Sequence, residues 1–429
     1  MKNKFIKSTI ILIIGGFITK ILGMIIKISL TRAIKTEGIG TYSLILPTFN
    51  LFITLCSMGL PTAISKLVSE NKIKSKKIVL PLIPLTLLFN LLLILLLLII
   101  SPILSNNLLK NTNTYYPLIS IGLTLPFICF SSILKGYFFG KEHMFPIILS
   151  NIIEQLVRLF LTVTIIPKLM TYSLTIAITG VVSINIISEF ISIISLILFI
   201  PKQHNIKLED FKYNKNILKD LLNISIPTTG SRLIGSISYF LEPIILTYVL
   251  QKQGYTNSYI TIEYGIINGY IYPLLLLPSF FTLAISNALL PVVSNSYSNN
   301  NYKYTKYKIK QAITLSLIIG IPCTLLFMTI PEYFLKLIYN TNEGIKYIKI
   351  ISPFFLLYYI QGPLTTSMQA MNKAKEAMVG TLLGTIIKTC LLLLISFFKI
   401  GIWNLIISNL INIIFITLHH YYYVFIKKK

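Results

Sequence analysis

Long apolar stretches, separated by short polar segments, alternate along the whole chain. A membrane-spanning α-helix needs roughly 20 apolar residues, and twelve stretches of the sequence reach that length. They cover residues 8–33, 39–67, 78–104, 115–138, 146–168, 173–200, 217–250, 264–296, 309–331, 346–370, 377–398 and 400–426. The pattern predicts an all-α polytopic membrane protein with about twelve transmembrane helices.

The N-terminal stretch has the features of a retained span. A short basic segment, Met1 to Lys7, precedes an apolar stretch from Ile10 to about Leu30. This stretch is longer than a signal-peptide core and has no small-residue cleavage site. We therefore expect it to form the first transmembrane helix.

The composition agrees with a membrane protein. Of the 429 residues, 54% are hydrophobic and 12% are charged, and that charged fraction is about half the fraction in soluble domains. A soluble enzyme, a disordered chain and a nucleic-acid-binding protein are therefore excluded, although Lys and Arg number 38 against 13 Asp and Glu. The cysteines have unrelated spacings that indicate neither a disulfide framework nor a zinc site; they are Cys56, Cys129, Cys323 and Cys390.

The basic residues predict the orientation in the membrane. If the N-terminus is cytoplasmic, 24 Lys and Arg residues fall on cytoplasmic segments and 9 on external connections. Cytoplasmic segments of membrane proteins carry the excess of Lys and Arg. We therefore expect a multi-pass protein of the bacterial cytoplasmic membrane with both termini in the cytoplasm.

The longest polar connection divides the predicted helices into two groups of six. We expect an N-terminal lobe at 1–200, a cytoplasmic linker at 201–216 and a C-terminal lobe at 217–429. Arg158 in the fifth span has an approximate counterpart, Lys388, in the eleventh, as a parallel repeat requires. Two six-helix lobes around a central cavity are a transporter architecture.

Charged residues inside the spans are the candidate functional residues, because a charge at the bilayer centre costs about 2.5–3.5 kcal/mol on insertion scales and usually faces a polar interior. The basic candidates for a substrate-binding cavity are Lys20, Lys27, Arg158, Arg232 and Lys388. The supporting or ion-coupling candidates are Glu154, Glu189 and Glu242. Because basic residues outnumber acidic ones, the set favours an anionic substrate such as a phosphate or pyrophosphate group.

The first span places two of these lysines on one helical face. Gly16, Lys20, Gly23 and Lys27 follow steps of four, three and four residues, which align them along the helix. We expect this face to line the cavity. The alternative for Lys27 is that its side chain extends toward the membrane surface.

The remaining candidates each have a structural alternative. Glu154 and Arg158 are four residues apart and can pair along their helix, either as a structural ion pair or beside a substrate. Glu189 is a partner for a nearby basic group or a coupling-ion site. Glu242 and Arg232 lie about 15 Å apart along the helix axis, too far to pair directly.

Lys388 ends a stripe of small residues in the eleventh span. Gly380, Gly384 and Lys388 are spaced four residues apart, and small residues allow helices to approach closely. Helix packing with a lysine that reaches the surface is therefore the alternative to a substrate contact for Lys388.

The sequence shows no catalytic or nucleotide-binding motif. Gly15 to Lys20 lies inside a span and lacks the spacing of a phosphate-binding loop. The histidines are scattered and suggest neither a metal site nor a catalytic triad; they are His143, His204, His419 and His420. We expect no enzymatic activity, no metal and no cofactor, and transport coupled to Na⁺, H⁺ or the membrane potential.

Two segments resemble a known family. Leu134-Lys135-Gly136-Tyr137-Phe138-Phe139-Gly140 followed by Ile153-Glu154-Gln155-Leu156-Val157-Arg158 is similar to the span 4–5 signature of the stage V sporulation protein B group. Span 8 and the Lys20-Ile21-Leu22-Gly23 segment fit the same group. The group belongs to the polysaccharide-transporter and MurJ-like lipid II flippase branch of the MOP (MATE-like) superfamily.

The resemblance implies two helical lobes, alternating access and the flipping of lipid-linked cell-wall or polysaccharide precursors, with a role in sporulation cortex synthesis. Lys20 and Arg158 match basic cavity positions of the family, and Glu242 matches an acidic one. The expected partners are a lipid-linked oligosaccharide or peptidoglycan precursor and membrane lipids, and the resemblance also allows cell-wall polymerases. The alternatives are a MATE-type multidrug or organic cation antiporter and, third, a membrane scaffold.

Overall fold

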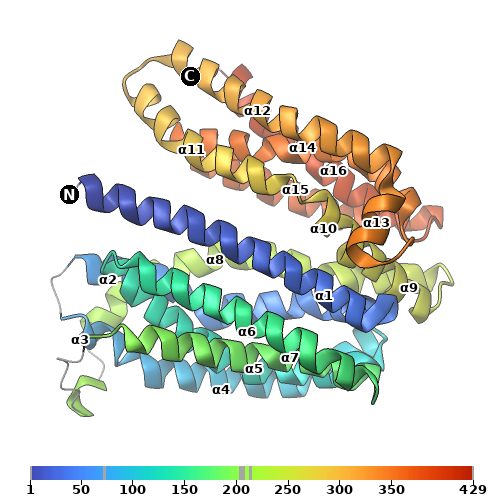
Figure 1. The fold of residues 1–429 in the computed structure, drawn as a ribbon, viewed down its shortest axis with the longest axis horizontal. Coiled ribbons are helices and arrows are strands. Elements are labelled where there is room, and N and C mark those ends of the chain that lie inside the picture. The colour runs from blue at the N-terminus through green and yellow to red at the C-terminus, as the bar shows by residue number, and fades with distance from the viewer. Residues whose placement is uncertain (1, 71–73, 202–207, 212–214, 428–429) are drawn as a thin grey trace. The chain divides into compact units, whose positions relative to one another are not determined.

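The computed structural model describes residues 2–70, 74–201, 208–211 and 215–427, and their regular structure is helical (Figure 1). The α-helices are α1 (Lys2–Ser57), α2 (Leu60–Ser69), α3 (Lys76–Val79), α4 (Leu82–Pro102), α5 (Tyr115–Gly140), α6 (Met144–Met170), α7 (Leu174–Leu198), α8 (Lys215–Lys252), α9 (Asn257–Gly265), α10 (Tyr272–Leu275), α11 (Ser279–Ser298), α12 (Tyr302–Thr329), α13 (Pro331–Tyr339), α14 (Ile345–Ala370), α15 (Ala374–Leu394) and α16 (Trp403–Tyr421). Short 3₁₀ or π turns are η1 (Ile103–Leu108), η2 (Thr112–Thr114), η3 (Leu208–Phe211), η4 (Ile266–Ile271), η5 (Ile395–Phe398) and η6 (Tyr422–Ile426).

The protein is an all-helical polytopic membrane protein. Within the described part of the chain, nine helical segments are long and apolar enough to cross a membrane, or ten if the bent segment 257–298 counts as one span. This number is lower than twelve partly because α1 joins two predicted segments, 8–33 and 39–67, across a kink at Lys35 (φ 56°). α14, which matches the predicted segment 346–370, is a further helix of 26 residues.

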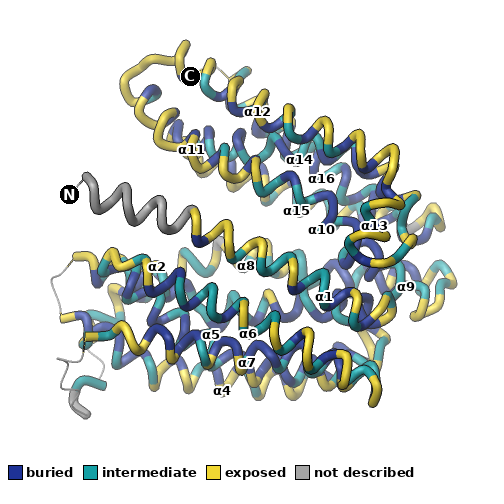
Figure 2. The backbone as a smooth tube through the Cα atoms, viewed as in Figure 1, coloured by how far each residue is buried: buried dark blue, intermediate teal, exposed yellow. Residues whose placement is uncertain are grey.

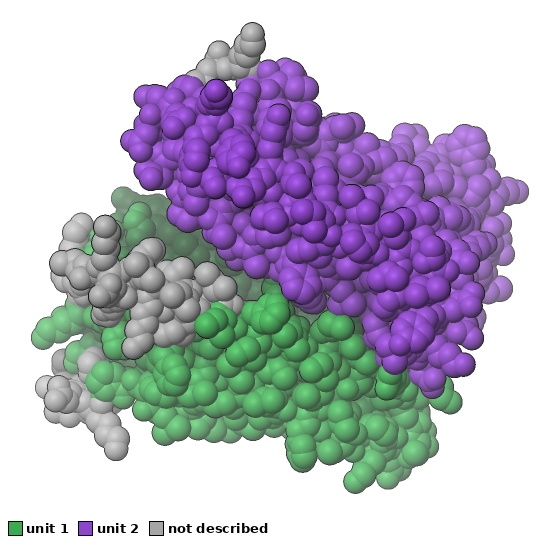
Figure 3. Space-filling view, turned by 45° about the horizontal axis from the view of Figure 1, so that its top comes forward, with its two compact units in different colours: residues 1–243 green, residues 244–429 purple. Residues whose placement is uncertain are grey.

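Two compact units make up the chain (Figure 3): unit 1 is residues 1–243 and unit 2 is residues 244–429. The division falls inside α8, whereas the sequence analysis placed it in the segment 201–216. Parts of that segment, 202–207 and 212–214, lie outside the described residues. In the described remainder, Asp210 of η3 forms an ion pair of 2.9 Å with Lys76. The six-and-six lobes stay a prediction.

In unit 1, several helices bury one side and expose the other, whereas α5 is mostly buried (Figure 2). α4 is an example: Thr86, Asn90 and Leu97 are buried, whereas Leu88 and Ile99 are 61% and 68% exposed. Such large exposed aliphatic side chains suit a lipid environment. The buried side faces α5, which also packs against α2 and α7, while α1 packs along α6.

Glycine allows α5 to approach α2 closely. A Cβ atom added at Gly140 would lie 2.6 Å from the Cβ of Val68 and 2.8 Å from the carbonyl oxygen of Ser65. At Gly136 the nearest atom would be the Cα of Pro61, at 3.0 Å. These two glycines of the Gly136–Gly140 segment therefore set the position of the α5 end that carries Lys135.

In unit 2, α14 lies among α11, α12 and α16, and α15 packs against α16. The Tyr359 hydroxyl of α14 donates a hydrogen bond of 2.7 Å to the Leu275 carbonyl oxygen of α10. Gly380 and Gly384 of α15 face His419 and Ile416 of α16. This confirms the close helix approach expected for the small-residue stripe.

Three details differ from the sequence analysis. The short helix α13 was not predicted. The lysines between 303 and 310 belong to α12, which begins at Tyr302, rather than to a connection. Lys135 is one of the 24 basic residues that the orientation analysis assigns to cytoplasmic segments, but it lies in the last turns of α5 and is half-buried.

Candidate functional site

Two ion pairs share Glu154 of α6 in unit 1, and one of them connects α6 to α5. The Arg158 Nη2 atom donates to Glu154 Oε1 at 2.8 Å, one turn apart on α6. The Lys135 Nζ atom of α5 lies 3.5 Å from the other carboxylate oxygen, Oε2. The Glu154 side chain is 8% exposed, and the Lys135 and Arg158 side chains are 20% and 24% exposed. Glu154 is therefore the buried centre of a three-residue charge network, and the predicted Glu154–Arg158 pair is confirmed.

Glu189 of α7 adds a fourth charge to this network. Its side chain is buried, and Lys135, Arg158 and Glu154 all act on it electrostatically. Its Oε2 atom has no hydrogen-bond partner among the described residues. We call Lys135, Glu154, Arg158 and Glu189 the charge cluster; its two positive and two negative charges balance.

Tyrosines extend the charge cluster toward α8. Tyr42 of α1 lies within electrostatic range of Arg158. Tyr239 of α8 lies within the same kind of range of both Tyr42 and Glu242. Glu242, which is 4% exposed, is thus connected to Arg158 through two phenol side chains from two different helices.

The other predicted residues of unit 1 lie on the surfaces of α1 and α8. Lys20 is exposed and Lys27 is half-buried on α1. Gly16 has open space around it. Gly23 faces α6: a Cβ atom added at Gly23 would lie 3.9 Å from the Oε1 atom of Gln155. The predicted face therefore borders α6 at one edge and is open at Gly16 and Lys20.

Arg232 is exposed on α8. The two glycines that flank it, Gly230 and Gly235, have no neighbouring atom within 4 Å of a built Cβ. Among the described residues, this stretch of α8 therefore leaves room for a Cβ atom at both positions.

Lys388 belongs to unit 2, where it is half-buried on α15. It continues the stripe of Gly380 and Gly384, which faces α16. This placement fits the packing alternative at the two glycines, and a role of Lys388 in substrate binding remains a prediction.

The sequence analysis missed Lys135, Tyr42 and Tyr239 as members of this region. Lys135 falls inside the predicted span 115–138. A charged residue inside a span was the criterion for a candidate, so this position could have identified Lys135. Tyr42 and Tyr239 gave no comparable signal, because tyrosine is common in membrane helices and its neighbours depend on helix rotation.

The charge cluster brings two cations and two carboxylates together. Among the described residues, no three His, Cys, Asp or Glu side chains are grouped so that they could hold a metal ion. Arginine and lysine donors next to buried carboxylates are suited to bind anions or to change protonation when a charged ligand arrives.

Comparison with known proteins identifies the family. The family model described as polysaccharide biosynthesis protein matches residues 5–297. The chain is also 34% identical to stage V sporulation protein B of Bacillus subtilis (strain 168), over 98% of this chain and 83% of that protein. The chain belongs to the polysaccharide biosynthesis protein family.

Other relatives agree with this assignment. The chain is 22% identical to the lipid II flippase MurJ of the same bacterium, over 91% of this chain and 77% of that protein. The MatE family model matches residues 269–394. Among solved structures, an inward-facing MATE family multidrug resistance transporter of the MOP superfamily has a TM-score of 0.72 at 16% identity, with 95% of this chain and 93% of that chain covered. This family member therefore has the MOP/MATE fold.

Proposed function

We propose that this transporter moves lipid-linked cell-wall or polysaccharide precursors, such as undecaprenyl-pyrophosphate sugars, across the bacterial cytoplasmic membrane by alternating access. The similarity to stage V sporulation protein B over nearly the whole chain supports a role in sporulation cortex synthesis. The asymmetry of basic residues supports a cytoplasmic location of both termini.

The main support for this proposal is the net positive charge of the candidate residues in unit 1. Glu154 and Glu189 balance Lys135 and Arg158 within the charge cluster. Among the other candidate residues of unit 1, Lys20, Lys27 and Arg232 add three positive charges, and Glu242 adds one carboxylate. A net positive set supports an anionic ligand, because ammonium and guanidinium groups form strong charge-assisted hydrogen bonds with phosphate oxygens. An organic cation would favour the opposite sign.

The basic residues have different roles in this proposal. Lys20 and Arg232, which are exposed on their helices, contact the pyrophosphate. Arg158 donates to Glu154 at 2.8 Å, so it supports the site from behind and offers its remaining donors to the ligand. Lys27 attracts the anion at longer range, and the substrate contact expected for Lys388 stays a prediction.

Glu242 is the proposed coupling residue. It is buried and within electrostatic range of Tyr239, so binding of Na⁺ or a proton there would change the field near Arg158. Glu242→Gln should then reduce transport while protein abundance stays normal. If Glu242 only neutralises a neighbouring cation, the variant should instead lose abundance, and transport per folded molecule should remain normal.

Complementation of a strain depleted of its lipid II flippase tests the proposal. Wild-type protein should restore growth and relieve precursor accumulation. Lys20→Ala and Arg232→Ala should each abolish complementation at unchanged membrane abundance. Lys168→Ala, a matched control at the exposed end of α6, should complement fully. Normal complementation by both Lys20→Ala and Arg232→Ala would contradict a basic substrate site.

A dye-efflux assay distinguishes the antiporter alternative. A MATE-type organic cation antiporter should lower the accumulation of a cationic dye in cells that express the protein, and the proposed flippase should leave it unchanged. Efflux that depends on Glu242 and is insensitive to Lys20→Ala would favour the antiporter.

A further inference from the structure

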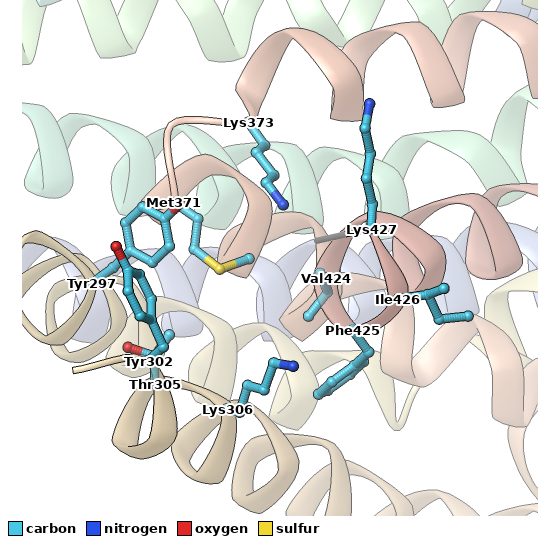
Figure 4. Close-up of a pocket in the computed structure, with 10 residues that line it drawn as sticks. All are labelled: Tyr297, Tyr302, Thr305, Lys306, Met371, Lys373, Val424, Phe425, Ile426 and Lys427. Carbon is cyan, nitrogen blue, oxygen red and sulfur yellow. The ribbon is translucent and has the colours of Figure 1, made fainter. Parts of the chain in front are cut away.

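A cavity of about 240 Å³ lies within unit 2, far along the chain from the charge cluster (Figure 4). It is formed where α11 ends and α12 begins, at the turn between α14 and α15, and by the turn η6 that follows α16. Three chain segments that are distant in sequence therefore meet around one small space.

Two lysines from different segments point into this space. Figure 4 shows the side chains of Lys306, from α12, and Lys373, from the α14–α15 turn, extending toward the region between Met371 and Val424. The Lys373 Nζ atom donates to the Tyr423 carbonyl oxygen at 2.8 Å. This hydrogen bond holds the Lys373 ammonium group in place at the edge of the space.

The lysine at the end of the described chain differs from these two. Lys427 extends away from the space in Figure 4, and its Nζ atom lies 4.5 Å from the centre of the Tyr423 ring. Lys306 and Lys373 are therefore the two cations that are placed to bind a group in the cavity.

The floor of the cavity is apolar. Met371 and Val424, each 6% exposed, belong to the hydrophobic core of this end of unit 2, and Tyr297 and Phe425 pack against that core. Ile426, at the edge, is 58% exposed. No carboxylate is among the described residues that line the space. The cavity therefore combines two ammonium groups with an apolar wall that continues to an exposed aliphatic side chain.

We propose that this cavity binds the phosphate headgroup of an anionic membrane lipid. Two ammonium groups match the charge of a phosphodiester, and basic pockets between membrane helices are suited to anionic headgroups. A soluble phosphate ester shares the same charged chemistry, but the apolar floor and exposed Ile426 suit the glycerol and first acyl carbons of a lipid. The inference does not depend on the transported substrate.

Native mass spectrometry of the purified full chain in neutral detergent tests the proposal, with phosphatidylglycerol as the probe. Lys306→Gln should weaken phosphatidylglycerol binding by about fivefold, the order expected for one lysine near an anionic lipid. Lys303→Gln removes the same charge from the same helix outside the cavity and serves as the control; its binding should stay close to wild type. Lys373→Gln should weaken binding as well.

Lys306 is the decisive position, because Lys373 also holds the Tyr423 carbonyl and its replacement can disturb folding. Equal losses in the Lys306→Gln and Lys303→Gln variants would mean diffuse attraction to anionic lipid and would overturn the proposal. Unchanged binding in Lys306→Gln would overturn it too. Competition by glycerol 3-phosphate at the same concentration as the lipid would assign the cavity to soluble phosphate esters instead.

Discussion

Replacing Glu154 by glutamine should destabilise the protein strongly, because this side chain is the common partner of two cations. Glu154→Gln removes the carboxylate that lies 2.8 Å from Arg158 Nη2 and 3.5 Å from Lys135 Nζ. In this variant, Glu189 is the one carboxylate of the charge cluster that remains to balance Lys135 and Arg158. Breaking a buried pair from one side costs about 3–5 kcal/mol.

The expected magnitude lies at the lower end of this range. A glutamine oxygen can still accept a hydrogen bond from Arg158, and the two cationic side chains are 20% and 24% exposed. We therefore expect a loss of about 3 kcal/mol in the free energy of unfolding, which is more than a hundredfold in the equilibrium constant. Arg158→Met should cost less, and Lys135→Met least, because Glu154 then keeps its 2.8 Å partner.

Unfolding in mixed micelles of SDS and dodecyl maltoside, followed by circular dichroism, measures this difference. Adding Lys135→Met to Glu154→Gln restores the charge balance and should recover part of the loss. A Glu154→Gln variant within about 0.5 kcal/mol of wild type, the range of ordinary surface substitutions, would refute the structural role assigned to the charge cluster.

Two further predictions concern packing and orientation. Gly140→Ala should lower the yield of folded protein in gel filtration by overpacking α5 against Val68, at a cost of about 1–3 kcal/mol, whereas Gly230→Ala, which meets no atom within 4 Å, should be neutral. In a cysteine-free background, a cysteine at exposed Lys74 should be protected from an impermeant thiol reagent in intact cells and one at exposed Asn257 should react; the reverse labelling would contradict the predicted topology.

The helices could be predicted from the sequence because each depends on a continuous apolar run. All twelve predicted ranges fall on helical segments of the structure, although short turns such as Met58–Gly59 and Leu276–Pro278 interrupt some of them. Their connections could not be predicted as well. The kink at Lys35 lies in a short polar segment whose sequence predicts a loop, but the backbone is helical on both sides of it. α13 has only nine residues, too few for a span-length pattern to detect.

The candidate site could be predicted only where it follows helical spacing. Glu154 and Arg158 are one turn apart, so their pairing follows from the sequence alone. The contact between Lys135 and Glu154 depends on how α5 and α6 are rotated against each other, and Gly136 and Gly140 set the position of α5 against α2. The same limit applies to Tyr42, whose approach to Arg158 depends on the packing of α1.

Translocation by the purified protein tests the central claim most directly. Proteoliposomes would carry an undecaprenyl-pyrophosphate sugar in both leaflets, and the fraction accessible to an added sugar-modifying enzyme would be followed over time. We expect wild-type protein to make the inner-leaflet pool accessible, and Lys20→Ala and Arg232→Ala proteins, equally abundant in the vesicles, to leave it protected. An inner pool that stays protected with wild-type protein under Na⁺, proton and voltage gradients would contradict the proposed function.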